Sequence, residues 1–174
     1  MKKLTLIRHA KSSREQTLLR DIDRPLSARG EQDAPLIARH LKELHDFAPD
    51  TFISSPALRA RTTGEIIQRE AALTHLTLHE ESRIYEAPVN TLATVLREIP
   101  NHLRHAVLCG HNPGLENLAN WLCGERAIYG LRTGGVVMLQ LDLDAWAEVR
   151  LGCGSLVTYF YPAQIGGGKD AHGD

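Results

Sequence analysis

The chain has 174 residues, of which 43% are hydrophobic and 24% charged, and its formal net charge is -1. This length and composition predict one ordinary globular domain, which buries roughly two-thirds of its unfolded surface without a disulfide or metal staple. A nearly neutral chain has no general attraction for nucleic acid or for an anionic membrane, so we expect neither as a partner. Fifteen of the twenty basic residues are arginine, whose planar guanidinium suits two-point capture of phosphate or carboxylate.

The cysteines give no sign of a disulfide framework or a zinc site, because their number is odd and no pair has C-x-x-C spacing. The apolar stretch at residues 4–7 is too short for a signal-peptide core, and no run reaches the roughly 20 apolar residues that span a bilayer. We therefore expect a cytoplasmic protein. Residues 1–165 should form its single domain, and the glycine-rich residues 166–174 should form a flexible tail.

Short apolar runs alternate along the chain with segments that carry apolar residues at helical spacing. Ser55 and Pro56 indicate the start of the second helix, as a capping residue followed by proline at the first helical position. Pro100 should end the third helix. The expected strands are residues 4–7, 51–54, 76–79, 106–109, 136–141 and 147–151, and the expected helices are about 31–45, 56–72, 92–99 and 115–122.

This alternation predicts an α/β domain of three layers, in which a mostly parallel central sheet is flanked by helices. Ligands of open α/β sheets bind at the carboxyl ends of the strands, and polar clusters follow the first, second and fourth expected strands. Each cluster alone is also explained by a solvated charge, a helix cap or a tight turn, so their coincidence at strand ends is what favours a site. The side chains that one crevice would bring together are Arg8, His9, Arg59 and His111.

Two arginines and two histidines suit phosphoryl transfer without a metal ion or other cofactor. Unit charges about 4 Å apart interact by roughly 4 kcal/mol at an effective dielectric near 20, so two guanidinium groups replace much of a phosphate's lost hydration. Their charge should keep a neighbouring histidine neutral and able to attack phosphorus. The second histidine and the arginines would stabilise charge on the phosphoryl oxygens, and water would then hydrolyse the phosphohistidine. The sequence contains no H-E-x-x-H, Walker-type or C-x-x-x-x-x-R motif.

Four segments resemble, in the same order, the motifs of the histidine phosphatase superfamily, whose fold is phosphoglycerate mutase-like. Ala10 stands where glycine usually follows the first histidine of the family. The short length, together with Arg-His-Ala-Lys-Ser and Gly-His-Asn-Pro-Gly, resembles the branch of SixA-type phosphohistidine phosphatases. The matching segments are residues 6–13, 23–30, 54–62 and 110–114.

The resemblance implies a role for each matching residue. His9 would be the phosphorylated nucleophile, and Arg8, Arg59 and His111 would form the phosphate pocket. Asn112, within the second-histidine motif, is a further substrate-binding candidate.

The family often places a carboxylic acid after the third strand, where it protonates the leaving group. Glu86 is the candidate for this acid, and Glu81 is the alternative, with Glu80 beside it. Surface acids in contact with solvent are an equally good explanation of all three. Arg24 is expected to bind substrate by adding positive potential near the pocket, although a plain surface role explains it as well.

Three functions remain open. A phosphorylated imidazole leaves readily once it is protonated, whereas an alkyl phosphoester needs a well-placed general acid. The motif around Glu86 is only partly kept, which favours a phosphohistidine on a phosphotransfer protein as the substrate. The alternatives are a sugar or nucleotide phosphomonoesterase on the same scaffold and a catalytically inactive domain that binds phosphate in a protein interaction. A phosphoglycerate mutase is less expected, because that activity normally accompanies a longer chain.

Overall fold

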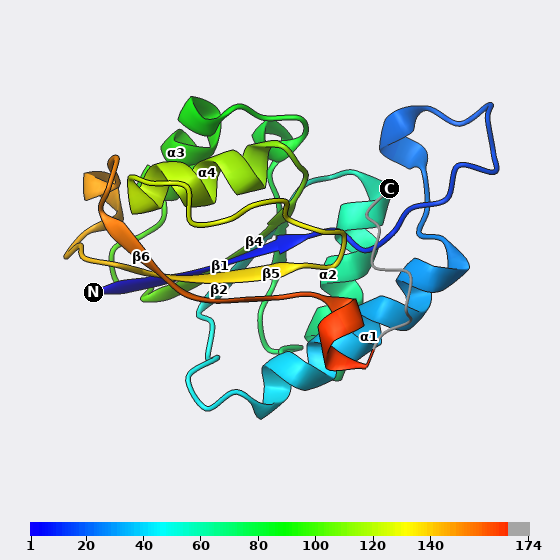
Figure 1. The fold of residues 1–174 in the computed structure, drawn as a ribbon, viewed down its shortest axis with the longest axis horizontal. Helices are drawn as coiled ribbons and strands as arrows, with labels where there is room; N and C mark the ends of the chain where they lie inside the picture. The colour runs from blue at the N-terminus through cyan, green and yellow to red at the C-terminus, as the bar shows by residue number, and fades with distance from the viewer. Residues whose placement is uncertain (167–174) are drawn as a thin grey trace.

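The computed structural model describes residues 1–166, so the expected tail lies, from residue 167 onward, outside the described residues. Within this range six strands form one sheet, in the order β3-β2-β4-β1-β5-β6 (Figure 1). Neighbouring strands from β3 to β1 run parallel, and β5 is antiparallel to both β1 and β6. The strands are β1 (Lys2–Arg8), β2 (Thr51–Ser54), β3 (Leu78–Glu80), β4 (His105–Gly110), β5 (Val136–Leu141) and β6 (Gly154–Phe160).

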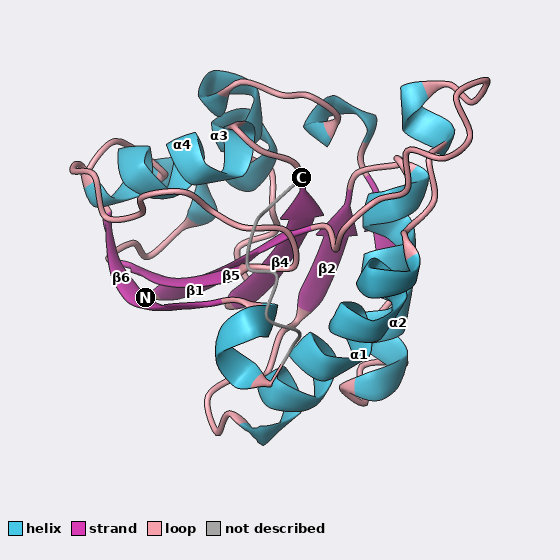
Figure 2. Ribbon diagram, turned by 45° about the vertical axis from the view of Figure 1, so that its right-hand side comes forward, coloured by secondary structure: helices cyan, strands magenta, loops and turns pink. Residues whose placement is uncertain are grey.

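The main helices lie on the two faces of this sheet. They are α1 (Ala28–Glu43), α2 (Leu58–Glu70), α3 (Val89–Arg97) and α4 (Gly114–Cys123). Figure 2 shows α1 and α2 on one side of the sheet and α3 and α4 on the other. The predicted three-layer α/β architecture with a mostly parallel sheet is therefore confirmed. None of the helices in the described part of the chain is long and apolar enough to cross a membrane.

Two apolar clusters hold the layers together, one on each face of the sheet. Neighbouring residues of β1 point to opposite faces, so Leu6 packs in the cluster of α3 and α4 while Ile7 packs in that of α1 and α2. Every residue of β4 is buried. Strands covered on both faces read as continuous apolar runs, which is why the central strands are recognisable in the sequence.

The last strand does not lie at residues 147–151, as expected from the sequence. That segment starts in a 3-10 turn, Trp146–Glu148, and the final strand is β6. Trp146 is fully buried and its Nε1 donates to the carbonyl oxygen of Leu103 at 2.6 Å, so the turn is held into the core rather than paired in the sheet. β6 is an edge strand with exposed Leu156 and Val157, and its sequence therefore lacks the alternation of a half-buried strand.

The register of the parallel strands places the carboxyl ends of β1, β2 and β4 at the same edge of the sheet. Arg8 of β1 lies opposite Gly110 of β4, and Ser54 of β2 lies opposite Cys109. The polar residues that follow each strand therefore leave the sheet side by side. This edge is where the sequence predicts a crevice.

Candidate active site

The loops after β1 and β4 bring the two predicted histidines together. His9 follows β1 and His111 follows β4, and their imidazole centroids lie 5.3 Å apart. Tyr85 joins the group, because its ring centroid lies 5.4 Å from that of His111 and 6.0 Å from the guanidinium carbon of Arg59. His9 and Arg59 are each 5% exposed and His111 is 7% exposed. Arg8, at the end of β1, is adjacent to His9 in the chain.

One hydrogen bond determines which nitrogen of His9 carries a proton. Nδ1 lies 2.7 Å from the carbonyl oxygen of Ala10, and a carbonyl oxygen can only accept, so Nδ1 donates. When the ring is neutral, its lone pair is therefore on Nε2. The backbone of Ala10 is held in turn, since its N–H donates to Oγ1 of Thr63 at 3.0 Å.

The second histidine is held through its other ring nitrogen, Nε2. Nε2 of His111 lies 2.7 Å from Oγ of Ser55, a fully buried hydroxyl that already accepts from the N–H of Ala57. The Ser55 hydroxyl has a hydrogen-bond acceptor for its own proton when it donates to Nε2 of His111. Because Nε2 then accepts, the proton of the neutral His111 ring is on Nδ1. Burial, followed by electrostatic interaction with His9 and Arg59, lowers the pKa of His111 to about 3, so the ring is neutral at physiological pH.

Among the buried side-chain atoms without a hydrogen-bond partner in the described part of the chain are two donors of this site, Nδ1 of His111 and Nε of Arg59. A buried donor without a partner costs on the order of 1–3 kcal/mol, so such donors usually face something that accepts. A phosphoryl group presents several acceptor oxygens and a negative charge, and it therefore matches both donors.

The guanidinium of Arg59 is fixed by Asp21, a residue that sequence reasoning missed. Nη1 and Nη2 of Arg59 donate to the carbonyl oxygen and to Oδ2 of Asp21, at 2.7 and 3.0 Å. The hydroxyl of Tyr85 and Nε of Arg24 also donate to this carboxylate. The pKa of Asp21 lies far below its usual value, chiefly because of the Tyr85 hydrogen bond and then those of Arg24 and Arg59, which together outweigh partial burial.

The two further substrate-binding candidates act on neighbouring residues. Arg24 binds Asp21 and donates to Oγ of Ser12 at 2.7 Å. Nδ2 of Asn112 donates to the carbonyl oxygen of Leu131 at 3.1 Å, and the same oxygen accepts from Nη1 of Arg8 at 2.9 Å. Asn112 therefore helps to place Arg8.

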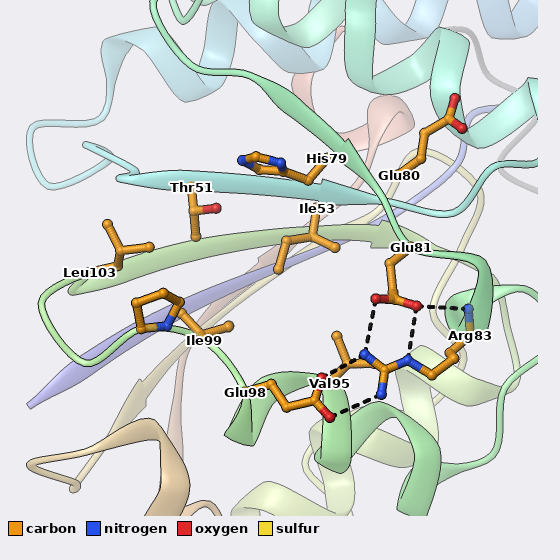
Figure 3. A pocket seen from close by; sticks show the side chains of 11 residues that line it. Thr51, Ile53, His79, Glu80, Glu81, Arg83, Val95, Glu98, Ile99 and Leu103 are labelled. Atoms are coloured by element: carbon orange, nitrogen blue, oxygen red, sulfur yellow. Dashed lines mark hydrogen bonds and ion pairs between the residues drawn. The ribbon is translucent and has the colours of Figure 1, made fainter.

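The three candidate acids lie in different surroundings. Glu86 is exposed and lines a cavity of about 460 Å³ that His111 also lines. Glu81 lines a separate cavity of about 320 Å³ and binds Arg83 at 2.9 Å, which in turn binds Glu98 at 2.7 Å (Figure 3). Glu80 pairs with Arg61 at 3.1 Å. Of the three, Glu86 is the one that shares a cavity with a predicted site histidine.

The role expected for Ser55 needs correction. The second helix does not begin at Pro56, because α2 starts at Leu58 and its N-cap, Ala57, has no side-chain cap. Ser55 still accepts from the N–H of Ala57 at 3.2 Å, but its shorter bond is to His111. The local sequence Ser-Pro is the same whether the serine caps a helix or binds a histidine. The contact with His111 becomes visible only in the folded structure.

Comparisons with known proteins agree with this architecture. The sequence model of the histidine phosphatase superfamily (branch 1) matches residues 4–118. An uncharacterised chloroplastic protein of Arabidopsis thaliana is 32% identical over 160 residues, which cover 84% of this chain and 70% of that protein.

Solved structures of similar length share the fold. A protein of Agrobacterium tumefaciens assigned as the phosphohistidine phosphatase SixA aligns with a TM-score of 0.79 and 25% identity, covering 92% of this chain and 98% of its own. The protein histidine phosphatase SixA complexed with tungstate aligns with a TM-score of 0.78 and 20% identity, covering 94% and 99%. The resemblance inferred from the motifs is confirmed. The chain belongs to the histidine phosphatase superfamily (branch 1), and it is similar to the SixA-type members in length and fold.

Proposed function

We propose that this phosphatase works without a metal ion, through a phosphohistidine on His9, and removes phosphate from a phosphorylated histidine on a phosphotransfer protein. The observation that carries the proposal is that the two neighbouring histidines are held through different ring nitrogens, His9 through Nδ1 and His111 through Nε2. Nδ1 of His9 donates to a carbonyl oxygen, which leaves Nε2 as the nucleophile. Nδ1 of His111, 7% exposed as a residue and without a partner among the described residues, donates to the phosphoryl oxygens.

The reaction proceeds in two displacements on phosphorus. The Nε2 lone pair of His9 forms a bond to phosphorus while the bond to the leaving atom breaks, and that atom takes a proton from Glu86. Arg8, Arg59 and His111 stabilise the negative charge on the phosphoryl oxygens during the transfer. Water then attacks phosphorus as Glu86 takes its proton, and the bond to Nε2 breaks to release inorganic phosphate.

The proposed substrate class is the one whose leaving group depends least on proton donation by Glu86. Glu86 is exposed, and an imidazole leaving group needs less assistance from an acid than an alkoxide does. The similarity to SixA-type proteins supports the same choice. A small-metabolite phosphomonoesterase is the second candidate, favoured by the cavity beside His111, which has room for a compact leaving group.

Intact-mass analysis after brief mixing with an activated phosphate donor tests the intermediate. The wild type should gain one acid-labile phosphoryl group, and His9→Ala should gain none. The matched control is His75→Ala, which removes an exposed histidine and should leave labelling unchanged. Labelling of His9→Ala, or activity on an aryl phosphate that a chelator abolishes, would overturn the mechanism. Phosphopeptide binding without any turnover would support an inactive binding domain instead.

Substrate preference is tested with Glu86→Gln. The variant should lose about 100-fold or more on alkyl phosphoesters, since general acid catalysis contributes on the order of 10²–10⁴, but much less on a phosphohistidine peptide. Turnover by the wild type of both substrate classes gives the reference values. A strong wild-type preference for alkyl esters, with strict dependence on Glu86, would reverse the assignment.

A further inference from the structure

A cavity of about 460 Å³ adjoins the proposed phosphoryl site on the side of His111. One wall is the segment before α3, which carries Glu86, and the other is the start of α4, which carries Asn117. Because His111 lines this cavity and would also bind the phosphoryl group, a group attached to that phosphorus has space to extend here.

The two walls are held in close contact, so the cavity is formed before substrate arrives. A Cβ atom on Gly114 would lie 2.5 Å from the carbonyl oxygen of Ala87, a separation at which one of the backbones must move. Glu86 has a φ of 53°, a left-handed conformation that a non-glycine residue adopts only where its surroundings impose it. Both features fix the segment of Glu86 against the start of α4.

The lining of the cavity has one sign of charge. Glu86 is its carboxyl group, which becomes a carboxylate as it gives its proton to the leaving group, and no lysine or arginine is among the lining residues in the described part of the chain. His111 contributes no charge, because burial lowers its pKa to about 3. The remaining walls are alanine, glycine, proline and the amides of Asn112 and Asn117.

Three N–H groups at the start of α4 are not available to bind an anion in this cavity. The N–H groups of Leu115, Glu116 and Asn117 already donate to His111, Asn112 and Pro113, at 3.0, 3.1 and 3.0 Å. A helix N-terminus binds anions through N–H groups that are not engaged elsewhere. Glu86 is therefore the charged group of the cavity lining once its proton has left, and the arginines that act on His111, Arg59 and Arg8, are those assigned to the phosphoryl group.

We propose that this cavity receives the leaving group, and that Glu86 and Asn117 select a neutral or cationic, N–H-bearing leaving group over an anionic one. The inference rests on the proposed function and narrows its substrate class. A phosphorylated imidazole, which leaves as a neutral N–H ring, fits this lining. A phosphoester whose leaving group carries a carboxylate or a second phosphate meets the charge of Glu86, and the cavity lining contains no lysine or arginine to offset it.

Two aryl phosphates that differ in the charge of one substituent test the selection: 4-(aminomethyl)phenyl phosphate and 4-carboxyphenyl phosphate. The measured quantity is the ratio of kcat/KM for the cationic substrate to that for the anionic one. Comparing this ratio between variants cancels the intrinsic difference in reactivity. Asn117 is exposed, so its substitution should not disturb the fold.

Asn117→Lys should lower the ratio about tenfold and Asn117→Asp should raise it, since a unit charge at short range in a partly solvated site changes binding by about this factor. The matched control is Asn101→Lys, which adds the same charge at an exposed turn before the opposite end of β4 and should leave the ratio unchanged. A phosphohistidine peptide, whose leaving group is neutral, should change less across the variants than either charged substrate.

The outcomes separate the two proposals. If turnover depends on His9 but the ratio is the same in wild type, Asn117→Lys and Asn117→Asp, the leaving group does not enter this cavity and the inference is wrong. A ratio that shifts equally in Asn101→Lys would show a general charge effect and would also overturn it. If the wild type hydrolyses none of the substrates, the proposed function fails and the inference fails with it.

Discussion

The hydroxyl of Ser55 decides which nitrogen of His111 can face a phosphoryl group. It lies 2.7 Å from Nε2, and this contact joins residues that are 56 positions apart in the sequence. A hydroxyl that donates to Nε2 keeps the proton on Nδ1, where no other described residue accepts it. Ser55 is therefore a positioning residue, which acts on phosphorus through His111.

Replacing Ser55 with alanine should lower kcat by about 10- to 100-fold, the range seen when the group that orients a metal-binding histidine is removed. KM should change less, because Arg8 and Arg59 still bind the phosphoryl group. The control is Ser54→Ala, which removes a neighbouring buried hydroxyl that donates to the carbonyl oxygen of Ser55 at 2.9 Å. Steady-state kinetics and unfolding of both variants check the prediction. Equal losses of kcat in Ser55→Ala and Ser54→Ala would show that Ser55 has only a structural role.

Long-range partners of this kind explain what the sequence could not show about the site. Arg8, His9 and His111 are predictable because each stands at the end of an apolar strand or directly after it. Asp21 and Tyr85 are not, since Asp21 lies in an irregular segment 38 residues before Arg59 and 64 residues before Tyr85. Nothing local in either segment signals that the folded chain joins them.

At the scale of the element, α1 is docked directly against the chain that leaves β1. A Cβ atom on Gly30, in the first turn of α1, would lie 2.2 Å from the carbonyl oxygen of Lys11. The N-cap serine reinforces the contact, because Oγ of Ser27 donates to the same oxygen at 3.1 Å. This close approach sets the position of the backbone two residues after His9.

Gly30→Ala should destabilise the fold by about 1–3 kcal/mol, the usual cost of overpacking, although alanine is the better helix former. It should also reduce phosphatase activity, because the displaced backbone includes the neighbours of His9. Gly64→Ala in α2 is the matched control, since its Cβ would meet only side-chain atoms, the nearest on Leu78 at 3.2 Å. Denaturant unfolding and turnover measure both effects. A Gly30→Ala protein as stable and active as Gly64→Ala would contradict this account.

Predictability at this scale follows burial. The central strands and α1 to α4 are recognisable within a few residues of their bounds, because burial imposes apolar periods on them. β6 is not recognisable, since this edge strand has no such pattern. The strand expected at residues 147–151 begins instead in a 3-10 turn that buried Trp146 holds in the core. The sequence therefore predicts the buried elements of the sheet but not its edge strand β6.

Across the whole molecule, two buried histidines at opposite ends of β4 couple stability to pH. Nε2 of His105 lies 2.8 Å from Oγ1 of Thr5, and burial, with Lys3 nearby, lowers the pKa of His105 to about 4. Burial, with His9 nearby, lowers that of His111 to about 3. Both rings stay neutral in the native state at pH values where an unfolded histidine, with a pKa near 6.5, binds a proton.

Stability should therefore fall as the pH falls from 7 to 5, because the unfolded chain then binds protons that the native chain excludes. Each of the two histidines should lower the free energy of unfolding by about 2 kcal/mol over this interval. Carboxylates with a lowered pKa, such as Glu81, lose their contribution below this window. In His105→Gln the free energy of unfolding should fall between pH 7 and pH 5 by only about half as much as in the wild type. This comparison does not depend on how stable the variant is at pH 7. Denaturant unfolding at pH 5, 6 and 7 measures the decrease, with the exposed His102→Gln as the matched control. If His105→Gln and wild type lose stability in parallel, His105 is already protonated in the native state.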